Sequence, residues 1–233
     1  TGCRRTRRPV PPGSIGHRTL MEVRLVHSAV RQFLWHSGKW DAAKYDQPIN
    51  QEDMAGTVLE FDFRVARGIE KLGVSLTDYE KRAMDYYWRY AGYLLGVDEA
   101  LLTATIEEQY MLALQLMSHL YSPTPDSEKL AKALLRDMAD KPPFMLSEDL
   151  LLAFSEYLLG PIVAKDLKIE ATLANRLKVQ AIRQFIRTAS VGRVLAPDFI
   201  QRYVEKGNHL LRRKNIADGL GGDPSQYAFR SLA

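Results

Sequence analysis

One histidine, His27, lies between two arginines in the segment MEVRLVHSAVRQFLW, residues 21–35. Arg24 precedes it by three residues and Arg31 follows it by four, so a helix would place both guanidinium groups within about one turn of the imidazole. Burial and the nearby positive charges both disfavour protonation of such a ring. Because neutral imidazole is the form that binds metal ions, His27 is a candidate metal ligand.

Two interpretations of His27 stay open from the pattern. Apolar residues repeat with it at spacings of three and four, which places it on the inward face of a helix. The common outcome is a core histidine that donates to a backbone carbonyl, with Arg24 and Arg31 in surface ion pairs. The alternative is an axial ligand to haem, because no second ligand at zinc-site spacing accompanies His27 and a porphyrin supplies four donors itself. The two arginines would then pair with the haem propionates.

The elements that must position these residues are helices, because apolar residues recur at helical spacing and no run alternates as a strand does. We therefore predict an all-α fold. The periodicity predicts eight helices, at roughly 18–37, 50–72, 77–95, 98–121, 126–140, 147–166, 170–190 and 197–214. No connecting segment is long enough for a domain linker. We expect one domain over 1–233, with residues 1–16 irregular or truncated and 215–233 loosely ordered.

Several polar residues stand where helices should begin. Side chains of this type accept hydrogen bonds from unpaired amides of the first helical turn. The predicted N-caps are Asn50, Thr77, Thr105, Asp126 and Ser147.

Two features beyond the histidine helix also have competing explanations. Gln51 or Thr57, in the first turns of the helix after Asn50, would either belong to an ordinary helix start or face a cofactor cavity. Gly92 and Gly96 follow Trp88 at helical spacing, although glycine inside a helix costs about 1 kcal/mol relative to alanine. Close helix packing is the favoured reason, and a flat macrocycle lying against these glycines is the alternative.

Composition narrows the function. The chain has 233 residues, 46% of them hydrophobic and 26% charged, and a single cysteine, so neither an intramolecular disulfide nor a cysteine zinc site can form. No Walker-type loop, GxSxG or HExxH motif occurs, which argues against the common nucleotide-binding and hydrolase classes. Residues 32–182 hold 16 basic and 23 acidic side chains, whereas both ends are basic. Aromatic residues do not interleave with the basic ends, so we expect no nucleic-acid partner.

Targeting signals are not apparent. No stretch approaches the roughly 18 apolar residues of a membrane span, and the first dozen residues lack the apolar region of a signal peptide. The location stays open from the sequence, and a cytoplasmic one is favoured. The chain begins with Thr rather than Met, so we also expect that its N-terminus is incomplete.

Four segments in fixed order resemble a known family: VRLVHSAVR followed by Trp35, then PINQEDMAGTVLEF, LGVSLTDYE and YYWRYAGYLLGV, within residues 13–100. They are similar to the catalytic domain shared by latex-clearing proteins, which are rubber oxygenases, and the endoplasmic-reticulum-bound oxygenase of mycophenolic acid biosynthesis. The resemblance implies a globin-like helical core that binds haem b, with His27 as the proximal iron ligand and catalytic centre. The family also places an Arg, a Lys and a Thr on a distal helix, for which residues 1–14 offer no matching spacing.

The resulting hypothesis is a haem-dependent oxygenase that uses O2 to cleave or oxidise a small apolar, isoprenoid-like substrate. His27 would be the catalytic metal ligand, and Arg24 and Arg31 would complete the cofactor-binding set. The alternative is a non-catalytic helical module with a degenerate haem site, which would bind a partner or contact a membrane surface through its basic ends. The sequence does not determine the oligomeric state.

Overall fold

The computed structural model describes residues 10–141 and 144–195, and these residues are helical with no strand. The all-α prediction is therefore confirmed. The chain divides into two compact units. Unit 1 comprises the chain up to Glu70 together with Leu76–Tyr121, and unit 2 comprises Lys71–Ser75 with the chain from Ser122 onward. The prediction of a single domain stays a prediction.

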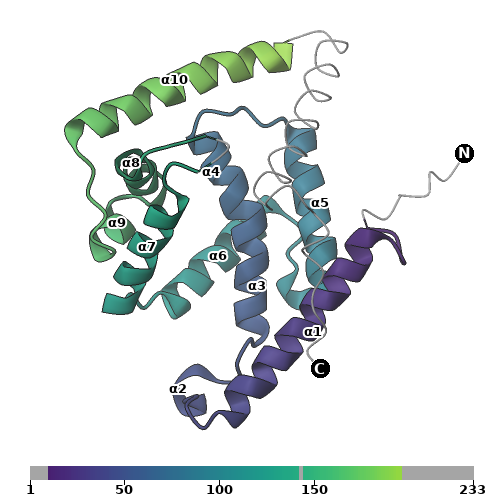
Figure 1. Cartoon of the computed structure of the whole chain (residues 1–233). Helices are drawn as coiled ribbons and strands as arrows, with labels where there is room; N and C mark the ends of the chain where they lie inside the picture. Colours follow the sequence, from purple (N-terminus) through teal and green to yellow (C-terminus); the bar gives the residue numbers. More distant parts are fainter. Residues whose placement is uncertain (1–9, 142–143, 196–233) are drawn as a thin grey trace, which may run out of the picture. The chain divides into compact units, whose positions relative to one another are not determined.

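Unit 1 contains the candidate site and is built around α3, which packs against α5 and α6, while α1 packs against α5 (Figure 1). Its elements are α1 (Ile15–His36), α2 (Ala42–Tyr45), α3 (Gln51–Leu59), η1 (Glu60–Arg64), α4 (Val65–Lys71, whose last residue belongs to unit 2), α5 (Asp78–Leu95), η2 (Glu99–Leu101) and α6 (Ile106–Leu120). Because η1 is a π-helical turn without a break in the chain, α3, η1 and α4 follow one another as the single helix predicted for 50–72.

Side-chain caps explain most of the helix starts. Asn50, Thr77 and Thr105 each form a capping box with the third helical residue, and Ser147 accepts from the amide of Leu150. These four predicted caps are confirmed. The predicted cap at Asp126 is wrong: the helix begins at Pro125 and is capped by Thr124, because proline has no amide hydrogen to lose at the first helical position.

Within the described residues, two helix predictions need correction and one short helix was missed. The predicted helix 98–121 is two elements, since the cap at Thr105 starts α6 anew after the short turn η2. The predicted helix 147–166 breaks at Gly160. This residue has a φ of 81° and is followed by Pro161, the first residue of the next helix. The four-residue helix α2 was not predicted. The helix predicted at 197–214 lies outside the described residues.

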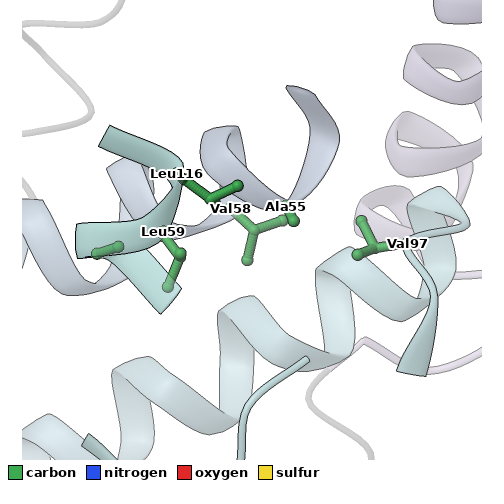
Figure 2. Packing of buried hydrophobic residues seen from close by; sticks show 6 residues of the cluster. Ala55, Val58, Leu59, Val97 and Leu116 are labelled. Atoms are coloured by element: carbon green, nitrogen blue, oxygen red, sulfur yellow. The ribbon is translucent and has the colours of Figure 1, made fainter. Parts of the chain in front are cut away.

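The core of unit 1 forms where α3 meets α6 and the end of α5. Figure 2 shows Ala55, Val58 and Leu59 of α3 with Val97 and Leu116, all of them buried. Gly92 permits this packing, because a Cβ atom there would lie 2.9 Å from Cδ2 of Leu102 and 3.1 Å from Cγ2 of Val58. Close helix packing, the favoured explanation for this glycine, is confirmed.

Unit 2 packs its helices around α8. Its helices are α7 (Pro125–Met138), α8 (Glu148–Leu159), α9 (Pro161–Asp166) and α10 (Leu173–Leu195), and α8 contacts each of the other three. Leu135, Ala164 and Ile169 form its buried cluster. In the part of the chain that the structure describes, no helix has the length and apolar character needed to cross a membrane.

Candidate functional site

His27 lies in the middle of α1, a helix capped at its start by Ser14. The side chain is half-buried, and its Nδ1 atom is buried without a hydrogen-bond partner. Among the described residues it is the one buried side-chain nitrogen or oxygen in this situation. Buried polar groups are nearly always hydrogen-bonded, so an orphaned ring nitrogen calls for an explanation such as an absent ligand.

A cavity of about 340 Å³ adjoins His27. Its lining comes from three elements of unit 1: Arg24, His27, Ser28 and Arg31 of α1, Gln51 and Met54 of α3, and Leu95 with Gly96 at the end of α5. The three residues predicted from the sequence thus lie together on one cavity. Their roles there stay predictions, because no ligand contact tests them.

Arg31 binds backbone rather than an acidic side chain. Its Nε donates to the carbonyl oxygen of Pro48 at 2.9 Å, and its Nη2 donates to that of Ile49 at 2.5 Å. Ile49 has a φ of 54°, a left-handed conformation that a β-branched residue rarely adopts. Arg31 therefore fixes the strained segment that leads into α3.

Arg24 lies against the turn that ends α5. Its Nη1 is 3.4 Å from the carbonyl oxygen of Leu94, and a Cβ atom added to Gly96 would lie 3.2 Å from its Cζ. Gly96 has a φ of 93° and is the C-cap of α5, so the turn needs glycine for its backbone as well as for this approach. Arg24 also lines a second cavity of about 630 Å³, together with His17, Met21 and residues 93–94 and 96–99.

The core-histidine interpretation predicted ion pairs for both arginines. Within the described ranges, neither Arg24 nor Arg31 lies in a salt bridge, and Nδ1 of His27 donates to no carbonyl. The contacts observed at Nδ1 and at the two arginines therefore differ from those that the core-histidine interpretation predicts.

Gln51 joins two walls of the cavity. Its Nε2 donates to the carbonyl oxygen of Gly96 at 3.1 Å, and its Oε1 accepts from the amide of Asp98 at 2.8 Å. Thr57, the other residue considered for the cavity, lines a different pocket of about 350 Å³ between α3 and α6. Its hydroxyl donates to the carbonyl of Asp53 at 2.8 Å.

His119, in the apolar helix α6, does not line this cavity. Its ring Nδ1 is 2.6 Å from Oε1 of Glu52, and its side chain is exposed. No group of three or more His, Cys, Asp or Glu side chains that could hold a metal ion occurs in residues 10–141 and 144–195. A metal at His27 would thus need most of its donors from another source, as the iron of a haem does.

A second polar cluster, buried in unit 1, was not predicted. Gln109 of α6 donates from Nε2 to Asp62 at 3.0 Å and to Asp85 at 2.6 Å, and Arg89 lies 3.7 Å from Asp85. Burial, and then the charge of Asp85, raise the pKa of Asp62 to about 6, while burial also raises the pKa of Asp85. The available signal was that Asp62 follows Val58 by four residues, on the apolar face of its helix.

A comparison with known sequence families agrees with the helical architecture and with the helix that carries His27. Residues 10–188 match the catalytic domain described as that of the ER-bound oxygenase mpaB/B' and rubber oxygenase. The chain belongs to this family of oxygenase catalytic domains. The resemblance noted from the four sequence segments is therefore confirmed.

Two particular relatives define how far the similarity extends. The rubber oxygenase of Streptomyces sp. (strain K30) is 30% identical over 144 residues, which is 61% of this chain and 35% of the relative. The solved structure of latex clearing protein LCP in the closed state superposes with a TM-score of 0.64 at 24% identity, covering 78% of this chain and 49% of that one. The chain thus spans about a third to a half of the length of these relatives.

Proposed function

We propose that this chain is the haem b-binding part of an oxygenase, with His27 as the axial iron ligand and Arg24 and Arg31 beside the haem carboxylates. The observation that supports the proposal most strongly is that His27, whose Nδ1 is buried without a hydrogen-bond partner, lines one cavity together with both arginines. Family membership supports oxygenase activity, and the name of one relative, rubber oxygenase, supports an apolar isoprenoid-like substrate.

The residues present fit a haem in three respects. A single imidazole suffices as the protein ligand, since the porphyrin supplies four donors. Two guanidinium groups on the same helix give cationic partners for two carboxylates. Gly96, where a side chain would meet Arg24, leaves open the place at which the α5 turn borders the cavity.

When bound, the haem iron would supply the binding and activation of O2. The chain's own contribution is to hold and shield that group. Met54 and Leu95 supply the apolar part of the cavity lining, and the other side chains that line it are polar.

Turnover tests this proposal. Haem-loaded protein is incubated with a short polyisoprene oligomer under O2, and O2 uptake and new carbonyl products are measured by mass spectrometry. We expect products that contain oxygen from O2, and none with His27→Ala. Haem-loaded protein that forms no product, yet binds anionic vesicles with a steep salt dependence, would contradict the enzyme and support the non-catalytic module.

A further inference from the structure

We propose that Gln51 is a positioning residue of the His27 cavity, which sets the place of the α5 turn and through it the guanidinium of Arg24. This inference rests on the proposed haem site. Gln51 is the first residue of α3, and the two groups it binds, on Gly96 and Asp98, lie 45 and 47 residues further along the chain. The amide therefore links two walls of one cavity.

The chemistry of the link requires an amide. One end of the Gln51 side chain donates to the Gly96 carbonyl while the other accepts from the Asp98 amide. A carboxylate offers acceptors only, so it would keep the second bond and face the Gly96 carbonyl oxygen with a like partial charge. A methionine of similar length offers neither bond of useful strength.

The α3 side of the link is held firmly. Asn50 and Asp53 exchange hydrogen bonds of 3.0 and 3.1 Å in a capping box, which fixes the first turn of the helix. Just before it, Arg31 holds the carbonyls of Pro48 and Ile49. The Gln51 side chain thus extends from the fixed first turn of α3. The α5 turn takes its position from Gln51, and not the reverse.

The position of the turn that ends α5 determines how much space is left for the Arg24 guanidinium. The guanidinium lies so close to Gly96 that even a methyl group there would be 3.2 Å from its Cζ. The guanidinium also lies 3.4 Å from the Leu94 carbonyl of the same turn, so a shift of the turn changes both the partner and the space that Arg24 has there. Because Arg24 is a proposed carboxylate partner, Gln51 would act on cofactor retention through Arg24.

The amide is exposed to solvent, so its two bonds contribute little to the stability of the fold. A purely structural link would change only the stability of unit 1. A positioning residue must also change how tightly haem is held, and this difference makes the two roles separable by experiment.

The experiment measures the rate of haem transfer from loaded protein to an excess of a haem-scavenging apoprotein, at pH 7.5 and pH 5. We expect Gln51→Glu to release haem at least about ten-fold faster than the native chain at pH 7.5, the lower end of effects for residues that orient cofactor partners. At pH 5 the difference should begin to shrink, because part of the carboxyl, whose ordinary pKa is about 4.3, is then protonated and can again donate to the Gly96 carbonyl.

Gln51→Met serves as the second variant, and Gln115→Glu, on the exposed side of α6, as the matched control. The methionine variant should release haem faster at both pH values without acid rescue, and the control should match the native chain. The charged and titratable groups near Gln51 are Asp53, Asp98, Arg24 and His27. Each rate is expressed relative to the native chain at the same pH, which contains all four of them.

Each outcome decides between the ideas. If the native chain takes up no haem, the proposed function fails and the inference with it. If the native chain binds haem and both Gln51 variants release it at the native rate, the positioning role alone is wrong. Loss of the folded state in both variants, measured by circular dichroism, would show that the amide is structural and would overturn the positioning role.

Discussion

The His27 cavity and the Asp62 cluster lie in the same compact unit, yet they differ in whether their buried polar groups are hydrogen-bonded. Around Asp62, one amide donates to two carboxylates, and an arginine lies close to the second. Around His27, a buried ring nitrogen has no partner although two arginines lie within a turn of the helix. The first arrangement is complete without a ligand, and the second is not.

The difference separates structural polar groups from functional ones. Buried polar networks that are fully hydrogen-bonded specify packing, whereas an unsatisfied buried group costs stability and persists where a ligand can satisfy it. A perturbed pKa alone would have pointed to Asp62 as the site. Hydrogen-bond satisfaction points to His27 instead.

The largest expected effect comes from breaking the complete network with Gln109→Leu. Two bonds to carboxylates are lost and the acids stay buried, so the free energy of unfolding should fall by about 3 kcal/mol. Urea denaturation followed by tryptophan fluorescence measures it, because Trp35, Trp40 and Trp88 all belong to unit 1. Gln115→Leu on the same helix is the control and should change the midpoint little. Equal effects of the two substitutions would contradict a structural role for the cluster.

A pH effect of similar size follows from Asp62. The unfolded chain loses this proton near pH 3.8, whereas the folded protein keeps it up to about pH 6. The folded state therefore binds the extra proton in between, and its stability should fall as pH rises from 4 to 6, by about 3 kcal/mol in total. Unfolding curves at half-unit steps of pH measure this slope.

Asp62→Asn isolates the contribution of that proton. The substituted amide has no charge to lose and its oxygen can still accept from Gln109, so the pH-dependent fall should become much smaller. Asp78→Asn, an exposed acid at the start of α5, is the matched control and should retain the native slope. A slope that survives Asp62→Asn unchanged would assign it to other groups.

A smaller effect of opposite sign is expected at the incomplete site. His27→Leu removes an unsatisfied nitrogen and keeps apolar volume, so the haem-free chain should gain about 1 kcal/mol of unfolding free energy. His36→Leu, at the exposed end of the same helix, should not. Thermal melting of the haem-free chains measures both. A destabilised His27→Leu variant would mean that the imidazole already has a stabilising partner.

The sequence predicted what depends on neighbours along the chain. The capping residues Asn50, Thr77 and Thr105 act over three residues, and Arg24, His27 and Arg31 share one helix, so local spacing determines both sets. The π-helical turn η1 could not be predicted in this way. It lies inside a continuous helix, and the hydrophobic pattern of the surrounding residues does not mark it.

What could not be predicted joins distant segments. Gln51 meets Gly96 and Asp98 only because α3 packs against α5, and Asp62 meets Gln109 only through the packing of η1 and α6. Arg31 was expected near an acidic side chain or a propionate, and its backbone partners at 48–49 became visible only when the connection to α3 was placed. Pairings of this kind are set by tertiary structure and have no signature in spacing.

The central claim, that the imidazole of His27 binds a haem iron, is tested most directly by titrating purified haem-free protein with haem and recording the Soret band. The native chain and His36→Ala should give the same saturable band, and His27→Ala should bind at least about 100-fold more weakly, since even outer-shell partners of a metal ligand are worth 10- to 100-fold. A native chain that gives no band, or a His27→Ala variant that gives the native one, would contradict the account.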